Sequence, residues 1–294
     1  MTKSSNLLSE IASNWRFHSH DSPWYKRMSA RISEIMHNFS SENSTQIELT
    51  PIGVLKLPFF QMGNINSSHL FGLDELIIFS LYDKLYPRAV AIDLGANIGL
   101  HSMVLEKLGY FVISYEPDPI HAKQFEINLA LNSVHNVKLH LSAVSTESGT
   151  AEFTRVKGNT TGSHLSGTSG KQPYGELEKF QVTTIDINSV LDLSENVTLV
   201  KMDVEGFEAR LLSALDVDRF DNTDFILEVG SEENANEIFT LIKSHKLSSY
   251  SQKTSWGKVK NFEDMPTSYR DGTLVITKRS NLLSSSSEKL IYWS

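Results

Sequence analysis

Charged side chains at regular spacing follow a short apolar run in the second half of the chain. The segment Lys201-Met202-Asp203-Val204-Glu205-Gly206-Phe207-Glu208 comes directly after the run from Val197 to Val200. If this run is a strand, its alternation places Lys201, Asp203 and Glu205 on one side, at the carboxyl end of the strand. Carboxylates there can act as general bases, whereas the lysine can pair with an acid or orient a bound molecule.

A second candidate site begins where the apolar run from Val90 to Leu94 breaks into a glycine turn. The turn has the pattern D-x-G-x-x-x-G, which starts at Asp93 and ends at Gly99. In an open α/β sheet the ligand crevice lies at the carboxyl ends of the strands, where such a loop leaves the sheet. Gly95 and Gly99 would let the backbone approach a ligand closely because neither carries a Cβ.

The kind of ligand follows from what this loop lacks. A dinucleotide-binding loop has the pattern G-x-G-x-x-G, so that helix amides can receive a pyrophosphate, but Asn97 stands where the second glycine should be. Asp93 would also add an anion close to that diphosphate. A cationic ligand therefore suits the loop better than a dinucleotide.

The glycine loop, together with Glu116 at the end of the next apolar run, resembles the S-adenosylmethionine site of class I methyltransferases. The resemblance implies that residues 95–99 pass the amino-acid moiety and that the Glu116 carboxylate accepts hydrogen bonds from both ribose hydroxyls. It also implies that the segment after the third strand receives the adenine. The expected cofactor-binding residues are Asp93, Gly95, Ala96, Asn97, Gly99, Glu116, Pro117, Ser142, Ala143 and Asp203.

Three segments together resemble the FkbM family of S-adenosylmethionine-dependent O-methyltransferases: Ile92 to Gly99, Tyr115 to Pro117 and Lys201 to Glu208. The string K-x-D-x-E-G-x-E is far more specific to this family than the glycine loop, and the likeness covers roughly residues 72 to 278. It implies an α/β, Rossmann-like class I methyltransferase fold, whose mostly parallel seven-stranded sheet has an antiparallel last strand and helices on both faces. It also implies methyl transfer to a hydroxyl of a small molecule, sugar or glycan.

Such a reaction needs a general base, because an aliphatic hydroxyl must lose its proton. The candidates are Asp203 first, then Glu205, then His101 on the helix after the glycine loop, and geometry decides among them. Lys201 could orient the acceptor. In an alternative, metal-assisted reaction, Asp203 and Glu228 hold a divalent ion, although a metal is not expected. A nicotinamide-dependent dehydrogenase and a non-catalytic cofactor-binding module are further alternatives.

Composition limits the remaining classes. The chain has 294 residues, a formal charge of −8, 40% hydrophobic residues and no cysteine, so it can bury a core but holds no disulfide, zinc-thiolate site or thiol nucleophile. The acidic balance and the lack of an N/D-P-P-Y/F string argue against nucleic acid as the acceptor. No signal-peptide pattern or membrane span is recognisable, so a cytoplasmic location is expected.

The elements that must position these residues follow from hydrophobic periodicity. Alternation of strand and helix patterns predicts a parallel sheet covered on both faces. Asp118 followed by Pro119 is typical of a helix N-cap. Strands are predicted at 89–94, 111–116, 136–141, 197–203 and 223–229, helices near 98–108, 118–133, 205–215 and 231–246, and final extended segments at 247–252 and 272–278.

An insertion lies between the third and fourth strands. Its extended flanks, 150–155 and 180–184, enclose a loop from Lys157 to Gly175 that is rich in Gly, Ser and Thr and contains His164. Loops of this length are usually functional or disordered. A polar lid around a hydroxylated acceptor and an ordinary surface loop both fit the composition.

The expected organisation is a helical extension at 1–45, a methyltransferase domain at 46–280 and a flexible tail at 281–294. A hairpin around Pro51 and a helix from Leu73 lead into the central strand. The extension carries an apolar face at helical spacing, which packs on the catalytic domain or on a second subunit as a homo-oligomer. The residues of that face are Tyr25, Met28, Ile32, Ile35, Met36 and Phe39.

Overall fold

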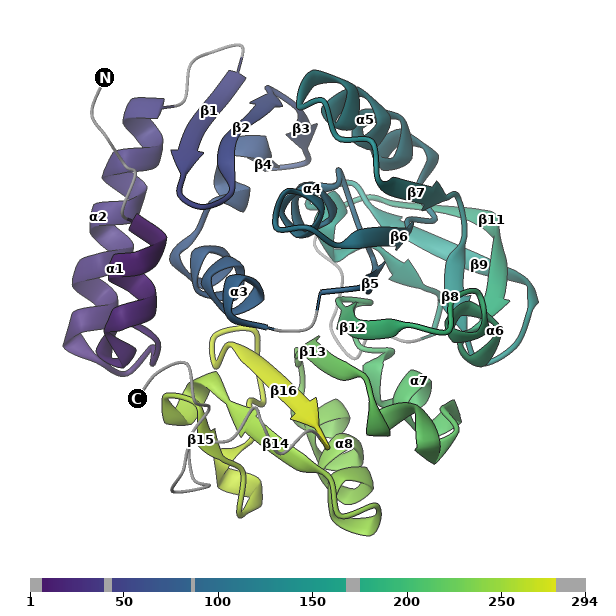
Figure 1. Cartoon of the computed structure of the whole chain (residues 1–294). Helices are drawn as coiled ribbons and strands as arrows, with labels where there is room; N and C mark the ends of the chain where they lie inside the picture. Colours follow the sequence, from purple (N-terminus) through teal and green to yellow (C-terminus); the bar gives the residue numbers. More distant parts are fainter. Residues whose placement is uncertain (1–6, 40–43, 86–87, 168–174, 279–294) are drawn as a thin grey trace.

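The computed structural model describes residues 7–39, 44–85, 88–167 and 175–278. Its centre is an eight-stranded sheet in the order β15-β14-β16-β13-β12-β5-β6-β7 (Figure 1). The five predicted central strands are all present and parallel to one another, which confirms the predicted α/β alternation. They are β5 (Val90–Leu94), β6 (Phe111–Tyr115), β7 (Val137–His140), β12 (Val197–Met202) and β13 (Asp224–Glu228).

The other edge of the sheet contains the predicted C-terminal strands. β16 (Thr273–Thr277) lies between β13 and β14 (Ser248–Ser251) and is antiparallel to both, as expected for the last strand. The sheet has one strand more than the seven predicted, because β15 (Gly257–Lys258) pairs with β14. A strand of two residues is too short to leave a hydrophobic period in the sequence.

Helices cover both faces of this sheet and form two cores. Adjacent strand residues face opposite sides: Ala91 lies in the core with α3 and α4, and Ile92 lies in the core with α6, α7 and α8. Burial on both faces explains why these strands are continuous apolar runs. The helices are α3 (Leu73–Lys84), α4 (Leu100–Lys107), α5 (Pro119–Leu131), α6 (Ile187–Asp192), α7 (Glu208–Ala214) and α8 (Glu232–Ser244).

The N-terminal elements pack beside α3 (Figure 1). The apolar face predicted for the extension is on α2, where Tyr25, Met28, Ile32 and Met36 are buried against the chain's own core. A homo-oligomer therefore stays an untested prediction, and the predicted tail at 281–294 lies outside the described residues. The elements are α1 (Leu7–Ser13), α2 (Pro23–Phe39), the hairpin β1 (Ser44–Leu49) and β2 (Gly53–Pro58), and the pair β3 (Gln61–Met62) and β4 (Ile65–Asn66).

Polar contacts hold α3 from both ends of the described chain. The Asp74 carboxylate at the start of α3 accepts hydrogen bonds from Tyr25 Oη at 2.6 Å and Gln252 Nε2 at 2.8 Å. His18 is fully buried, and Trp256 Nε1 donates to its Nδ1 at 2.7 Å. Burial lowers the pKa of His18 to about 4, so this ring is a neutral part of the core.

None of the described helices has the length and apolar character needed to cross a membrane.

The insertion forms a small sheet of its own, in the order β10-β9-β11-β8. The two predicted extended flanks pair as antiparallel strands, and the end of β11 runs parallel to β8. Residues 168–174 of the predicted loop lie outside the described part of the chain. The elements are β8 (Ala143–Ser145), β9 (Gly149–Val156), the short 3₁₀ helix η3 (Thr160–Gly162), β10 (His164–Leu165) and β11 (Leu177–Asp186).

Candidate active site

A cavity of about 540 Å³ opens at the carboxyl ends of the parallel strands. Its walls include Glu75 from α3 and residues 159–165 of the insertion. The glycine loop and the charged motif from Lys201 to Glu208 both contribute residues to the cavity, as expected at this edge of an α/β sheet. Four strand ends supply its base: Gly95 after β5, Glu116 after β6, Asp203 after β12 and Glu228 on β13.

The glycine loop is held against the neighbouring strand ends. The backbone N–H groups of Gly95 and Ala96 both donate to the Tyr115 carbonyl, at 3.1 and 3.0 Å. Gly95 has a φ of +73°, and a Cβ there would overlap the Asp203 carbonyl oxygen. The glycine therefore brings the two motifs into backbone contact. Gly99 packs against the Phe125 ring and does not line the cavity.

Gly95→Ala should destabilise the protein more than Gly109→Ala. Both glycines have a positive φ, but a Cβ at Gly109 would have no atom within 4 Å. The control substitution should cost about 1–2 kcal/mol of backbone strain. Gly95→Ala should cost about 2 kcal/mol more, because the Asp203 backbone cannot yield as a flexible side chain would. Urea denaturation measures both, and equal losses would mean that the contact is not rigid.

Glu116 is a buried carboxylate at the end of β6, with 5% of its surface exposed. Its Oε2 accepts a hydrogen bond from Asn97 N at 2.8 Å, and its Oε1 accepts one from Asp118 N at 2.8 Å. Burial raises the pKa of Glu116 to about 8, against the effect of these two donors. Each oxygen keeps lone-pair capacity for one more donor.

Lys201 is the centre of a charge cluster that reaches the cavity wall. Its Nζ lies 3.2 Å from Asp203 Oδ2 and 3.6 Å from Asp93 Oδ1. Burial acts to lower the pKa of Lys201, but the charges of Asp203 and Asp93 outweigh it and raise this pKa. Asp93 is fully buried and also accepts a hydrogen bond from Ser102 Oγ at 2.6 Å. It pairs with Lys201 rather than lining the cavity.

Two further carboxylates face the same cavity. Glu205, in a left-handed conformation with a φ of +54°, accepts a hydrogen bond from Tyr269 Oη. Burial raises the pKa of Glu228 well above its usual value, and the nearby charges of Asp203 and Glu205 raise it further. The part of the cavity lined by Asp203, Glu205 and Glu228 therefore has more hydrogen-bond acceptors than cations.

His101 lies in the cavity wall with both ring nitrogens occupied. Its Nδ1 is 2.9 Å from Tyr82 Oη, and its Nε2 is 2.7 Å from Glu75 Oε2. Both ring nitrogens thus lie against protein groups, and His101 stays an untested candidate for the general base.

The cavity brings together most, but not all, of the residues predicted for the site. Asp93, Gly99 and Ser142 are buried outside its lining. The predicted residues that do line it are Gly95, Ala96, Asn97, His101, Glu116, Pro117, Ala143, Lys201, Asp203, Glu205 and Glu228.

Several lining residues were not predicted from the sequence, notably Glu75, Tyr269 and His121. Their contacts to the motifs span long stretches of sequence; Tyr269 and Glu205, for example, are 64 residues apart. For the insertion, the sequence leaves two interpretations open, a polar lid around the acceptor and an ordinary surface loop.

Within the described ranges, no group of three or more His, Asp or Glu side chains is placed to hold a metal ion. Asp203 and Glu228, the two carboxylates predicted for the metal-assisted alternative, both line the cavity, but Asp203 is already paired with Lys201. The donor set expected for a hard divalent cation is therefore incomplete here.

Comparison with known families places both motifs in one domain. Residues 93–251 match the model described as the methyltransferase FkbM domain, which covers more than half of the chain. Methyltransferase 1 of Beauveria bassiana (strain ARSEF 2860) is 24% identical over 173 residues, or 52% of this chain and 70% of that protein. Glu75 and Tyr269 lie outside the matched range.

Solved structures show more distant likeness. Precorrin-6y C5,15-methyltransferase from Geobacter metallireducens GS-15 has 12% identity and a TM-score of 0.41, with 69% of this chain and 86% of that chain covered. A SAM-dependent methyltransferase from Agrobacterium tumefaciens has 8% identity and a TM-score of 0.42, with 81% and 70% covered. Both TM-scores are below 0.5, and neither likeness bears on the acceptor.

Proposed function

The chain belongs to the FkbM methyltransferase family, and from this premise we propose that it transfers a methyl group from S-adenosylmethionine to a hydroxyl of a small molecule, sugar or glycan. The observation that supports this best is that one cavity joins Glu116 and the glycine loop to the carboxylates of the K-x-D-x-E motif. We assign the cofactor to the part of the cavity lined by Glu116 and the glycine loop, called the cofactor end. We assign the acceptor to the part lined by the carboxylates of the K-x-D-x-E motif, called the acceptor end.

At the cofactor end, a buried polar atom lacks a partner that a nucleoside could supply. Tyr115 lines the cavity, and its Oη is buried without a hydrogen-bond partner among the described residues. Ser142 Oγ also lacks a partner among those residues but lies outside the lining. Glu116 has capacity for two ribose hydroxyls, one on each oxygen. With Ala143 in the wall, these residues fit the ribose and adenine positions that the family resemblance implies.

At the acceptor end, the task of the protein is to position a hydroxyl and remove its proton. When bound, S-adenosylmethionine supplies the methyl group on sulfur; the acceptor oxygen forms the new O–C bond as the C–S bond breaks. Asp203 is the proposed base because it lines the cavity and its backbone packs against Gly95, beside the cofactor loop. Glu205 is the alternative, held by Tyr269. Lys201 orients the Asp203 carboxylate.

The charge of the acceptor end favours a hydroxyl-rich acceptor. Glu75, Asp203, Glu205 and Glu228 line the cavity, and Lys201 lies beside Asp203. Carboxylates accept hydrogen bonds from hydroxyls but repel phosphates and carboxylates. Thr160, Thr161 and Ser163 of the insertion add hydroxyl-bearing residues to the lining. A sugar or another polyhydroxylated molecule therefore fits better than an anionic acceptor.

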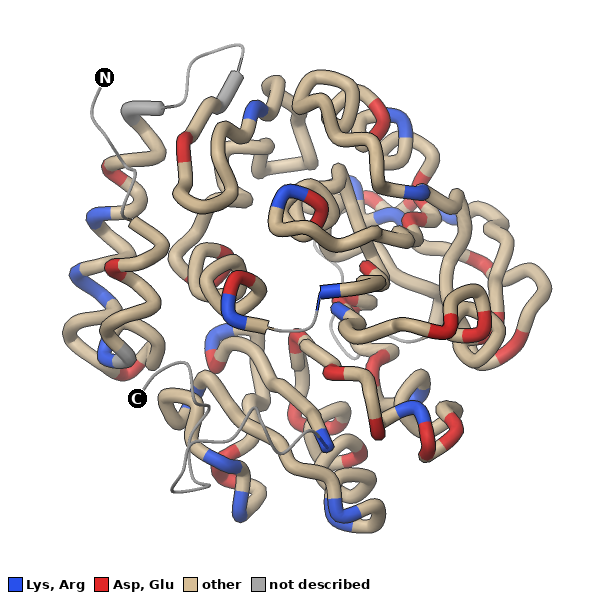
Figure 2. Tube along the Cα trace, in the orientation of Figure 1, with Lys and Arg blue, Asp and Glu red and all other residues tan. Residues whose placement is uncertain are grey.

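The alternatives have less support. In Figure 2, Lys and Arg are interspersed with Asp and Glu along the described chain, which does not favour nucleic acid. Asn97, which stands in place of the second glycine, disfavours a dinucleotide. A non-catalytic module would bind the cofactor but show no turnover. A cytoplasmic location stays a prediction.

Calorimetric titration of S-adenosylhomocysteine, with NAD as the control ligand, tests the cofactor. The wild type should bind S-adenosylhomocysteine and not NAD, and Glu116→Ala should weaken this binding by about tenfold or more, since it removes two charge-assisted hydrogen bonds. Preference for NAD, or no binding of either ligand, would overturn the proposed function. Repeating the titration from pH 6 to pH 9 adds a check on Glu116.

A carboxyl with a pKa of about 8 must lose its proton before both oxygens can accept, so affinity should rise with pH through 8. The matched Glu116→Gln variant should lack this rise.

A further inference from the structure

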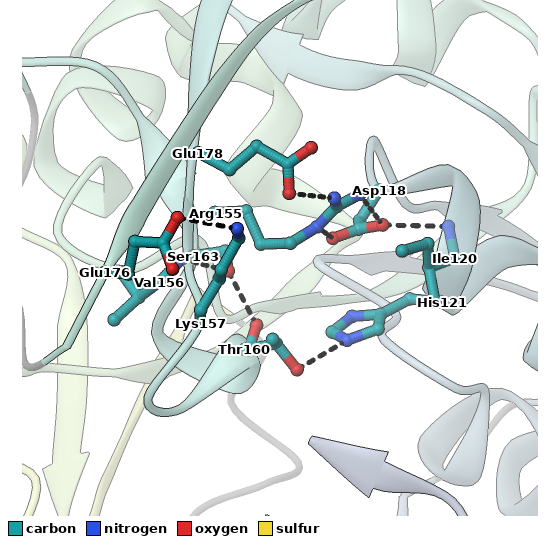
Figure 3. Close-up of polar contacts among 10 residues, drawn as sticks. All are labelled: Asp118, Ile120, His121, Arg155, Val156, Lys157, Thr160, Ser163, Glu176 and Glu178. Atoms are coloured by element: carbon teal, nitrogen blue, oxygen red, sulfur yellow. Dashed lines mark hydrogen bonds and ion pairs between the residues drawn. The ribbon is translucent and has the colours of Figure 1, made fainter. Parts of the chain in front are cut away.

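A buried ion pair joins the insertion to the start of α5. Arg155 on β9 donates from Nε to Asp118 Oδ2 at 2.6 Å and from Nη2 to Asp118 Oδ1 at 2.7 Å (Figure 3). The Asp118 side chain is fully buried, and Arg155 is 7% exposed. A third nitrogen of Arg155 donates to Glu178 on β11 at 2.8 Å. Two parallel hydrogen bonds fix the orientation of β9 as well as its distance from α5.

Asp118 is also in direct contact with the proposed cofactor carboxylate. Its backbone N–H donates to Glu116 Oε1, and its side chain caps α5 by accepting from Ile120 N at 2.8 Å. One residue thus holds Glu116 on its backbone side and Arg155 on its carboxylate side. Glu116, Asp118 and Arg155 are thus connected by hydrogen bonds, so a change in the position of Glu116 can be transmitted to the insertion.

A second contact joins α5 to the part of the insertion that lines the cavity. His121, on the first turn of α5, has its Nε2 2.9 Å from Thr160 Oγ1 in η3. Burial lowers the pKa of His121 to about 4, so the ring is neutral and the contact is an uncharged hydrogen bond. Residues 159–165, which contain η3, form part of the cavity wall.

We propose that Arg155 is a positioning residue that couples the cofactor carboxylate Glu116 to the acceptor wall at 159–165. This inference rests on the proposed function, because it takes Glu116 as the site of the ribose hydroxyls. When Glu116 engages a ligand, Asp118 and the start of α5 are held more firmly, and Arg155 and His121 pass this restraint to the insertion. Binding of the cofactor then holds the wall at 159–165 in place for the acceptor, so the acceptor binds second.

Hydrogen exchange of the full chain with and without S-adenosylhomocysteine tests this coupling without an acceptor. In the wild type, the ligand should slow amide exchange in residues 157–165 by about fivefold or more, in the range of ordinary coupling free energies. Arg155→Lys keeps the charge but cannot make the two parallel hydrogen bonds. It should still bind the ligand at Glu116 but lose most of the slowing at 157–165.

Two matched controls separate coupling from general loosening of the insertion. Glu178→Gln removes the half-exposed partner of Arg155 but leaves the pair with Asp118, and Lys157→Met removes an exposed ion pair with Glu176 on the same insertion. Both variants should keep the slowing. Thr160→Val introduces no buried charge and should lose part of the slowing at 157–165. This variant therefore tests the coupling if Arg155→Lys does not fold.

The outcomes are distinct. Binding of S-adenosylhomocysteine to the wild type without slower exchange at 157–165 would overturn the coupling and leave the proposed function intact. Full slowing in the folded Arg155→Lys variant, or in Thr160→Val if the former does not fold, would also overturn it. Failure of the wild type to bind the ligand would overturn both proposals.

Discussion

Lys201→Met should lower the free energy of unfolding by about 3–5 kcal/mol, the range for removing one partner of a buried ion pair. The lysine is 7% exposed and lies between Asp203 and the fully buried Asp93. Methionine fills much of the same volume, so a cavity contributes little. The loss arises because the fully buried Asp93 carboxylate is left without its cationic partner.

Urea denaturation measures this loss, and two variants show its origin. Lys179→Met removes an exposed pair with Glu152 and should change stability little. The double variant Lys201→Met with Asp93→Asn should recover much of the loss, because the unpaired charge is gone. No recovery in the double variant would mean that Lys201 stabilises the fold by packing and not by charge.

Asp203→Ala should reduce turnover by about 10²–10⁴-fold, the contribution typical of a general base. Affinity for S-adenosylhomocysteine should stay within a few-fold of the wild type, because the backbone contact with Gly95 is unchanged by the substitution. Lys201 keeps Asp93 as a partner, so the variant should fold. The measurement follows a labelled methyl group from S-adenosylmethionine into hydroxylated acceptors.

Near-normal turnover in this variant would remove Asp203 from the mechanism. Glu205→Gln would then be the next test, since Glu205 is the other proposed base on the same motif. A loss of turnover accompanied by an equal loss of cofactor affinity would instead assign Asp203 to cofactor binding.

The sheet could be predicted because its central strands are buried on both faces. Ala91 and Ile92 face different cores, so the strand is apolar apart from Asp93, and the other chemistry-bearing residues lie at or just after the end of each apolar run. This is why Glu116, Lys201 and Asp203 could be placed at one edge of a sheet from the sequence alone.

The contacts of Glu75 and Arg155 could not be predicted in the same way. Glu75 lies on α3, and the hydrophobic periodicity of this helix predicts which side is buried but not that its first turn lines the cavity. Arg155 pairs with Asp118, which lies 37 residues away in the sequence. Side-chain alternation also left the direction of Asp93 open; it lies within β5 and turns to Lys201 and Ser102, so a residue predicted to bind the cofactor is buried beneath the site.

The pairing of β8 with β11 has a consequence for exchanging parts between proteins. Because Ala143–Ser145 and Thr184–Asp186 are hydrogen-bonded neighbours, the insertion leaves and rejoins the domain at a single place. A segment of different length and sequence can be transplanted between these two strands without altering the order of the main sheet. Such a graft keeps the two hydrogen bonds to Asp118 only if it carries an arginine at the position of Arg155.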